Sequence, residues 1–266
     1  MADPFAACEG LVRRADPDRY FSALFAPAPV RPFLFVLYAF NVELARVAEA
    51  VREPMLGAIR LEWWRETLEG AGQGAPRNHD VARGLALLFA QTPLTPAGLQ
   101  ALVAARAFDS SADRLPNLVA LENYVDATGG ALMRLAIALL GGDEIFAREA
   151  GLAYGLTGLL RSLPFHNARH KLYMPVDLIA ATNLTPEEFF VLKNDDRQGA
   201  VVQQLALRAR DHWLAAHSGP RPGRALAALL PAALVPLYLR KLSSGRDVPI
   251  HRRQMALLSA AMRKRL

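Results

Sequence analysis

The segment 161–175 (RSLPFHNARHKLYMP) gathers three cations and a phenol directly after an apolar stretch. Arg161 and Arg169 offer planar guanidinium forks, and Lys171 offers a point charge, a combination that suits recognition of a phosphate group. Tyr173 adds a hydroxyl donor. These residue types favour an anion site, although an ordinary solvated loop can have the same composition.

Two further pairs are spaced by four residues, the spacing that places side chains on one face of a helix. Asp109 and Asp113 could hold Mg²⁺, which binds one or two carboxylates and leaves positions for phosphate oxygens. A solvated helix end is the more ordinary interpretation of that pair. His166 and His170 lack an obvious third ligand, and Pro164 argues against a helix there. We therefore predict no metal site from these residues alone.

Composition limits the class of protein that could carry such sites. The chain has 266 residues, of which 52% are hydrophobic and 21% charged, so a large buried core is expected and disorder is excluded. The single cysteine, Cys8, excludes a disulfide framework.

Charge is concentrated at the C-terminal end. The net charge is +6, yet residues 240–266 carry +7, so the first 239 residues carry −1. We expect such a segment to meet an anionic lipid surface or an acidic partner, and not a nucleic acid, which requires a basic face on a recognisable module.

No targeting or membrane-spanning segment is expected. Acids at Asp3 and Glu9 precede the first basic residue, unlike a secretory signal or a mitochondrial presequence. The longest uncharged run, 225–239, has 15 residues, whereas a spanning helix needs about 20. We expect a cytoplasmic protein, peripheral on the inner membrane at most.

Apolar residues recur at helical spacing almost throughout, and no alternating strand pattern is present. This periodicity predicts an all-α fold made of one domain over residues 1–266, with nearly apolar helices in the middle of a helical bundle. An oxygen-bearing residue precedes Pro17, Pro54, Pro96 and Pro186, as at capped helix starts. The predicted helices are 4–14, 17–25, 30–51, 54–69, 79–91, 96–113, 118–140, 143–166, 175–181, 186–193, 196–217, 223–243 and 250–265.

A bundle of this size could enclose a central cavity for an apolar ligand. We expect its walls to include residues 33–40 and 153–160, with Arg169, Lys171 and Tyr173 at one mouth. A fully packed core is an equally open alternative.

The block 160–177 (LRSLPFHNARHKLYMPVD) resembles the squalene/phytoene synthase family, whose active members read approximately LRDVxEDxxRGRxYLPxD. Further similarity lies in 37–40 (LYAF) and 121–124 (LENY). The resemblance implies the all-α isoprenoid (terpenoid) synthase fold around a central cavity. It also implies two aspartate-rich motifs, in which Mg²⁺ ions grip prenyl diphosphates.

Both aspartate-rich motifs are degenerate in this chain. The first, usually LYAFCRxxDDxxDE, reads LYAFNVELARVAEA, so that Ala45 and Arg46 replace aspartates and Glu49 remains an acid. In the second, Ser162 and His166 stand at the aspartate positions. The resemblance thus implies loss of Mg²⁺-dependent prenyl transfer, and we predict no catalytic residue, metal or cofactor.

The cationic part of the second motif is retained. Arg161, Arg169, Lys171 and Tyr173 match the family pattern, with lysine standing for arginine at 171. A prenyl diphosphate or another lipid is the ligand that this resemblance suggests for the cavity.

The departures follow one branch of the family. Segments 40–45 (FNVELA) and 60–69 (RLEWWRETLE), together with 160–177, resemble the non-synthase branch of complex I assembly factors. That branch implies a role in assembling respiratory NADH dehydrogenase, with complex I subunits as partners. The alternative is an active head-to-head prenyl diphosphate synthase or another isoprenoid transferase, which would use Mg²⁺ with Glu49 and Asp109.

The last predicted helix, 250–265 (IHRRQMALLSAAMRKR), has an apolar middle between basic ends. Such a helix could lie at a membrane interface or dock on the bundle. The sequence favours neither.

Overall fold

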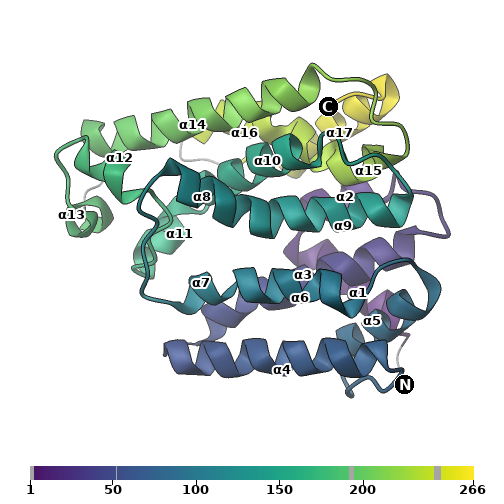
Figure 1. Ribbon diagram of the computed structural model, residues 1–266. Helices are drawn as coiled ribbons and strands as arrows, with labels where there is room; N and C mark the ends of the chain where they lie inside the picture. The colour runs from purple at the N-terminus through teal and green to yellow at the C-terminus, as the bar shows by residue number, and fades with distance from the viewer. Residues whose placement is uncertain (1–2, 52, 192–194, 243–246) are drawn as a thin grey trace.

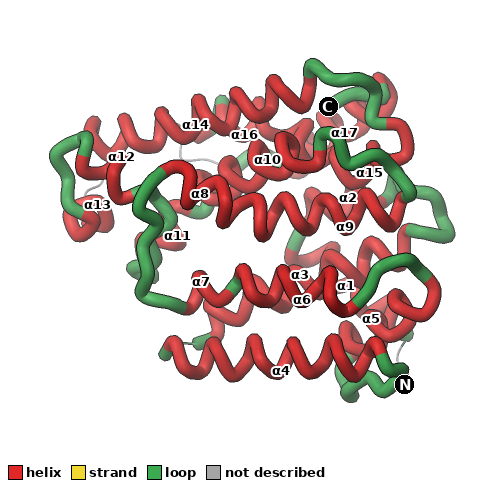
Figure 2. Tube along the Cα trace, viewed as in Figure 1, coloured by secondary structure: helices red, strands yellow, loops and turns green. Residues whose placement is uncertain are grey.

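The structure is a computed structural model that describes residues 3–51, 53–191, 195–242 and 247–266. Within these ranges every regular element is helical and none is a strand (Figure 2). The all-α prediction is therefore confirmed.

The elements follow one another along the chain with short connections. The first half contains α1 (Pro4–Ala15), α2 (Pro17–Ala23), α3 (Arg31–Ala50), α4 (Pro54–Gly72), α5 (Asp80–Gln91), α6 (Pro96–Ala105), α7 (Ala107–Ser110) and α8 (Leu118–Val125). The second half contains the π-helical turn η1 (Asp126–Gly130), α9 (Ala131–Leu140), α10 (Ala147–Arg161), α11 (Leu163–Ala168), α12 (Val176–Ala180), α13 (Pro186–Val191), α14 (Asp196–His217), η2 (Gly223–Ala225), α15 (Leu226–Leu229), η3 (Leu230–Leu234), α16 (Val235–Leu239) and α17 (Ile250–Arg263).

Most predicted helices are present, but four of the longer ones are interrupted. The 96–113 helix ends at Ser110, and the 143–166 helix breaks at Ser162 before Pro164. The 118–140 helix contains η1, and the 223–243 helix is divided into 3₁₀ and α segments around its prolines. The predicted ends at 192–193 and 243 lie outside the described residues.

Helix α3 lies inside the bundle, between the α4 side and the α9–α10 side (Figure 1). Its residues 34–40 are buried on every side and belong to the largest hydrophobic cluster. The expectation that residues 33–40 form a cavity wall was wrong, because these side chains fill the core instead.

A glycine contact lets α10 approach η1 closely. A Cβ on Gly151 would lie 2.6 Å from the Cα of Gly130, and a Cβ on Gly155 would lie 2.4 Å from a methyl of Val125. Only hydrogen fits at these positions. The contact fixes α8, and with it Tyr124, beside α10.

The C-terminal helix α17 docks on the bundle. Leu257 and Ala260 are buried there, and the Arg253 guanidinium donates to the Asp18 carboxylate at 3.1 Å. Its other large apolar side chains stay exposed: Ile250, Met255, Leu258 and Met262. The helix therefore combines a packed inner face with an apolar outer face.

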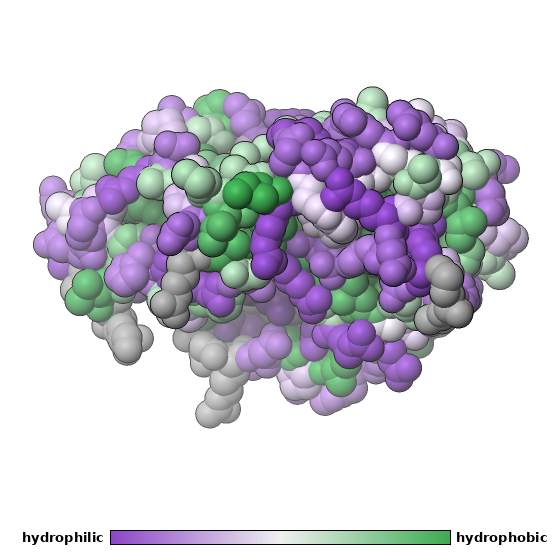
Figure 3. Space-filling model, turned by 90° about the horizontal axis from the view of Figure 1, so that it is seen from below, coloured by the Kyte–Doolittle hydropathy of each residue, from purple (hydrophilic) through white to green (hydrophobic). Residues whose placement is uncertain are grey.

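No helix in the described ranges is long and apolar enough to cross a membrane. Seen from below, hydrophobic atoms form separate small patches among hydrophilic ones (Figure 3). Met55, Leu56 and Ile59 of α4 are large apolar side chains that remain exposed.

Candidate functional site

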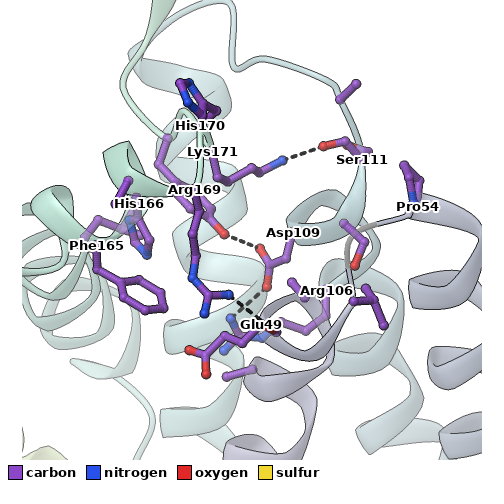
Figure 4. A pocket seen from close by; sticks show the side chains of 18 of the residues that line it. Glu49, Pro54, Arg106, Asp109, Ser111, Phe165, His166, Arg169, His170 and Lys171 are labelled. Atoms are coloured by element: carbon purple, nitrogen blue, oxygen red, sulfur yellow. Dashed lines mark hydrogen bonds and ion pairs between the residues drawn. The ribbon is translucent and has the colours of Figure 1, made fainter. Parts of the chain in front are cut away.

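A cavity of about 840 Å³ opens between the end of α3, the α7 region and the α11 region. Glu49 and Asp109 lie on one side, and Phe165, His166 and Arg169 lie on the other (Figure 4). The fold thus brings residues of both degenerate motifs to one cavity, although they are separated by more than a hundred positions in the sequence.

The motif positions do not all reach this cavity. Ala45, Glu49 and His166 line it. Arg46 instead lines a separate hollow beside Trp63 and pairs with the Glu43 carboxylate at 3.6 Å. The structure therefore does not place the Arg46 cation in the cavity.

Arg161 and Ser162 line a second cavity, of about 390 Å³. The Arg161 guanidinium lies 3.6 Å from the Tyr238 ring centroid and donates to the Asp247 carboxylate at 3.2 Å. Of the four predicted anion-binding residues, the structure brings together Arg169, Lys171 and Tyr173 and separates Arg161 from them.

Arg169 is exposed at the cavity edge. Its guanidinium donates to the main-chain oxygen of Glu49 at 3.0 Å and lies 4.4 Å from the Phe165 ring centroid. This bond ties the α11 side of the cavity to the end of α3 and leaves other guanidinium N–H donors toward the cavity.

Lys171 is occupied by the protein itself. Its ammonium donates to the main-chain oxygens of Phe108, at 2.5 Å, and Ser111, at 2.9 Å, and also lies over the Phe108 ring. Burial lowers the pKa of this amine, while Asp109 and Asp113 oppose the shift. Lys171 therefore mainly closes the end of α7, where carbonyl groups lack helical partners.

Asp109 is the centre of a buried network. Its carboxylate accepts hydrogen bonds from Tyr124 at 2.5 Å, from Tyr173 at 3.0 Å and from the Arg106 guanidinium at 3.1 Å. Arg106 also donates to the Asn41 side chain at 3.1 Å, which links the network to α3.

These contacts shift the protonation equilibria of the network. Burial, reinforced by neighbouring Tyr124 and Asp109, raises the pKa of the Tyr173 phenol. Burial alone would lower the Arg106 pKa, but the adjacent Asp109 outweighs it and the pKa is raised. The groups are therefore held as neutral phenols around a carboxylate–guanidinium pair.

The two pairs spaced by four residues do not act as pairs. Asp109 is buried, whereas Asp113 is exposed, because the helix ends at Ser110. His170 has a left-handed backbone (φ 52°) beyond the end of α11, so it does not share a helix face with His166. The expected helical spacing was wrong for the aspartates, whereas the histidines do not share a helix, in agreement with the doubt raised from Pro164.

His166 sits in an unusual environment for an imidazole. Its ring centroid is 4.6 Å from that of Tyr173, and its buried Nδ1 has no hydrogen-bond partner among the residues that the structure describes. Burial lowers its pKa to about 4, with Asp109 opposing and Arg169 and Lys171 adding to the shift. The ring is therefore neutral at pH 7.

This pKa predicts an acid sensitivity. Because the folded state resists protonating His166 while the unfolded chain protonates near pH 6.5, stability should fall as the pH drops from 6.5 toward 4. The full loss is about 3 kcal/mol. His166→Phe, which keeps a ring against Tyr173, should reduce the difference in unfolding free energy between pH 7 and pH 4.5. Equal curves for His166→Phe and the unmodified protein would contradict the assignment.

The donor set does not fit the Mg²⁺ clusters that the fold family implies. The cavity's acids are Glu49 and Glu53 at the α3–α4 connection, and Asp109, which already accepts three hydrogen bonds. The facing wall from α11 onward contributes imidazole, aromatic and cationic groups but no carboxylate. Nowhere in the described ranges do three or more histidine, cysteine or acidic residues gather as a metal site.

Comparison with known proteins finds relatives from one family. The family model for squalene/phytoene synthase matches residues 12–259. Complex I assembly factor 6 of Homo sapiens is 30% identical over 241 residues, covering 88% of this chain and 72% of that protein. Presqualene diphosphate synthase of Rhodopseudomonas palustris is 26% identical over 204 residues, covering 74% and 72% respectively.

Solved structures agree on the fold. A dehydrosqualene synthase in complex with ligand superimposes with a TM-score of 0.77 at 16% identity, covering 98% of this chain and 95% of that one. A squalene synthase from Alicyclobacillus acidocaldarius gives a TM-score of 0.69 at 16% identity, covering 98% and 94%. The arrangement of helices around the cavity is thus that of the isoprenoid synthases, and the chain belongs to the squalene/phytoene synthase family.

Proposed function

We propose that this protein is a family member without prenyl transferase activity, which acts in the assembly of a respiratory NADH dehydrogenase, peripheral on the inner membrane. The loss of catalysis is inferred from the cavity wall around α11. This wall lies opposite Glu49, and its described residues include no carboxylate. The family resemblance implies Mg²⁺ ligands in both motifs, and metal charge would stabilise a departing pyrophosphate. The similarity to complex I assembly factors supports the assembly role.

The remaining acids do not replace the lost metal ligands. The Asp109 carboxylate already accepts hydrogen bonds from Arg106, Tyr124 and Tyr173. Breaking these contacts would leave the Arg106 guanidinium without its charged partner. Glu49 is exposed, and the described residues of the facing wall include no carboxylate. The cavity is therefore better suited to holding a ligand or a partner's side chains than to ionising a diphosphate.

The enzymatic part of the proposal can be tested directly. Purified protein incubated with farnesyl or geranylgeranyl diphosphate and Mg²⁺ should release no more pyrophosphate than a protein-free control. The double variant Ala45→Asp/Arg46→Asp, which restores both missing aspartates of the first motif, should be equally silent, because His166 still stands at an aspartate position of the second motif. Mg²⁺-dependent release by the unmodified protein would establish the synthase alternative instead.

The assembly role needs a separate test in cells. Deleting the gene should lower NADH:quinone oxidoreductase activity in isolated membranes, and expressing the wild-type chain should restore it. Glu49→Gln, which removes the acid at the former metal position, should restore activity fully, because assembly needs no metal ligand there. Unchanged oxidoreductase activity in the deletion strain would refute the assembly role even if the protein proves catalytically silent.

A further inference from the structure

A groove runs across the face formed by α14, α16 and α17, on the side of the bundle away from α4 (Figure 1). It consists of two adjoining hollows, of about 410 and 660 Å³, which share Trp213, Pro236 and Arg240. We call this feature the basic groove. It shares no lining residue with the cavity between α3 and α11.

The lining is rich in cations. Within the described residues, no aspartate or glutamate side chain lines either hollow. Arg210, Arg240 and Arg252 are exposed, and no carboxylate in the described part of the chain pairs with them. The arginines of the lining are Arg210, Arg240, Arg252, Arg263 and Arg265. This charge is complementary to an anionic ligand.

Large apolar side chains accompany the arginines. Leu207 is 51% exposed and Met255 is 63% exposed, and both line the groove. Met262, two turns further along α17, is 70% exposed. Trp213 lies where the hollows meet, and its buried indole Nε1 has no acceptor within the described part of the chain. Tryptophan and cations around exposed apolar groups are typical of surfaces that meet the lipid headgroup region.

We propose that the basic groove binds the surface of a bilayer that contains anionic phospholipid, with lipid phosphates at Arg240 and Arg252 and apolar contact through Leu207 and Met255. A bilayer fits better than an acidic protein, because it alone offers a phosphate layer directly above an apolar layer. Leu257 and Arg253 hold α17 on the bundle, so that its outer face stays exposed to solvent. Binding therefore does not require α17 to detach from the bundle. This proposal rests on the peripheral membrane placement proposed above, for which it names the contact surface, but it does not depend on the assembly role or on the loss of catalysis.

Vesicle flotation tests the proposal with the full chain. The protein should float with vesicles of phosphatidylcholine and phosphatidylglycerol but not with phosphatidylcholine alone, and rising salt should weaken binding by screening. Arg240→Gln and Arg252→Gln should each lower the partition coefficient about fivefold, and the double variant about 25-fold. Arg14→Gln removes an exposed charge from α1, outside the groove, and should leave flotation unchanged.

A second readout locates the contact. Lipids with brominated acyl chains should quench part of the tryptophan fluorescence, and Trp213→Phe should remove that part. Met255→Ser should weaken flotation without affecting folding, because the side chain is exposed. Equal flotation with both vesicle types, an Arg14→Gln effect as large as that of Arg240→Gln, or quenching that survives Trp213→Phe would overturn the proposal. Binding to poly-glutamate without binding to vesicles would also overturn it and assign the groove to an acidic protein.

Discussion

Replacing Asp109 with leucine should lower the free energy of unfolding by about 3–5 kcal/mol, the cost of removing one partner from a buried ion pair. Among the described residues, the change leaves the Arg106 guanidinium with the Asn41 amide oxygen as its remaining acceptor. It also deprives the hydroxyls of Tyr124 and Tyr173 of their shared acceptor. Urea denaturation followed by circular dichroism measures the loss.

Two related variants make this prediction specific. Asp109→Asn keeps the shape and an acceptor oxygen but removes the charge, so its cost should be smaller, about 2 kcal/mol. Asp113→Asn alters the exposed neighbour and should change stability by less than about 0.5 kcal/mol. A cost below about 1 kcal/mol for Asp109→Leu would mean that the carboxylate does not hold this cavity wall together.

This network is a part of the site that the sequence did not predict. The sequence marked Asp109 as a possible Mg²⁺ ligand and placed Tyr124 in the LENY segment, but nothing in it linked these two residues to each other or to Arg106. They meet because α6 stops at Ala105 and α8 runs into the close-packed η1 turn. Such breaks depend on tertiary packing, which helical periodicity does not encode.

The fold was more predictable than the site. The continuous 3.6-residue periodicity, together with oxygen-bearing residues before prolines at helix starts, predicted nearly every helix. Residues 34–40, which are apolar on every side of their helix, are buried in the centre of the bundle as expected. The same burial explains why the prediction that residues 33–40 line a cavity was wrong, because a helix that packs on all faces leaves no space beside it.

Motif alignment alone also misplaced two cations. Arg46 and Arg161 occupy family positions that suggest the cavity, yet their long side chains reach acids elsewhere, at Glu43 and Asp247. An arginine extends far from its backbone, so sequence position fixes the Cα and not the charged group. Arg169, which was expected at the cavity mouth, does line the cavity, and its guanidinium keeps donors beyond the one that binds Glu49.

A second buried carboxylate, Asp18, joins elements that are distant in sequence. It accepts hydrogen bonds from Tyr154 and Arg253, each at 3.1 Å, and from Tyr238. Arg161 approaches it at 3.8 Å. One side chain thus links α2, α10, α16 and α17, and only 4% of its surface is exposed.

Asp18→Leu should therefore cost about 3–5 kcal/mol of unfolding free energy, because it leaves the Arg253 charge and two phenols without their acceptor. Arg253→Met should cost less, about 1–3 kcal/mol, since Asp18 keeps Tyr154, Tyr238 and Arg161. Urea denaturation gives both values. Asp247→Asn, which alters an exposed carboxylate that pairs with Arg161, serves as the control and should change stability by less than about 1 kcal/mol.

Arg253→Met should also act locally, because Arg253 is the α17 side chain that reaches Asp18. Amide hydrogen exchange should accelerate in α17, where few other side chains are buried, while α9 keeps its protection. Loss of protection in both helices to the same degree would show that α17 unfolds only with the whole bundle. Unchanged exchange in α17 would show instead that Leu257 and Ala260 hold the helix without the ion pair. The two measurements together separate the contribution of the ion pair from that of apolar packing in keeping the basic groove assembled.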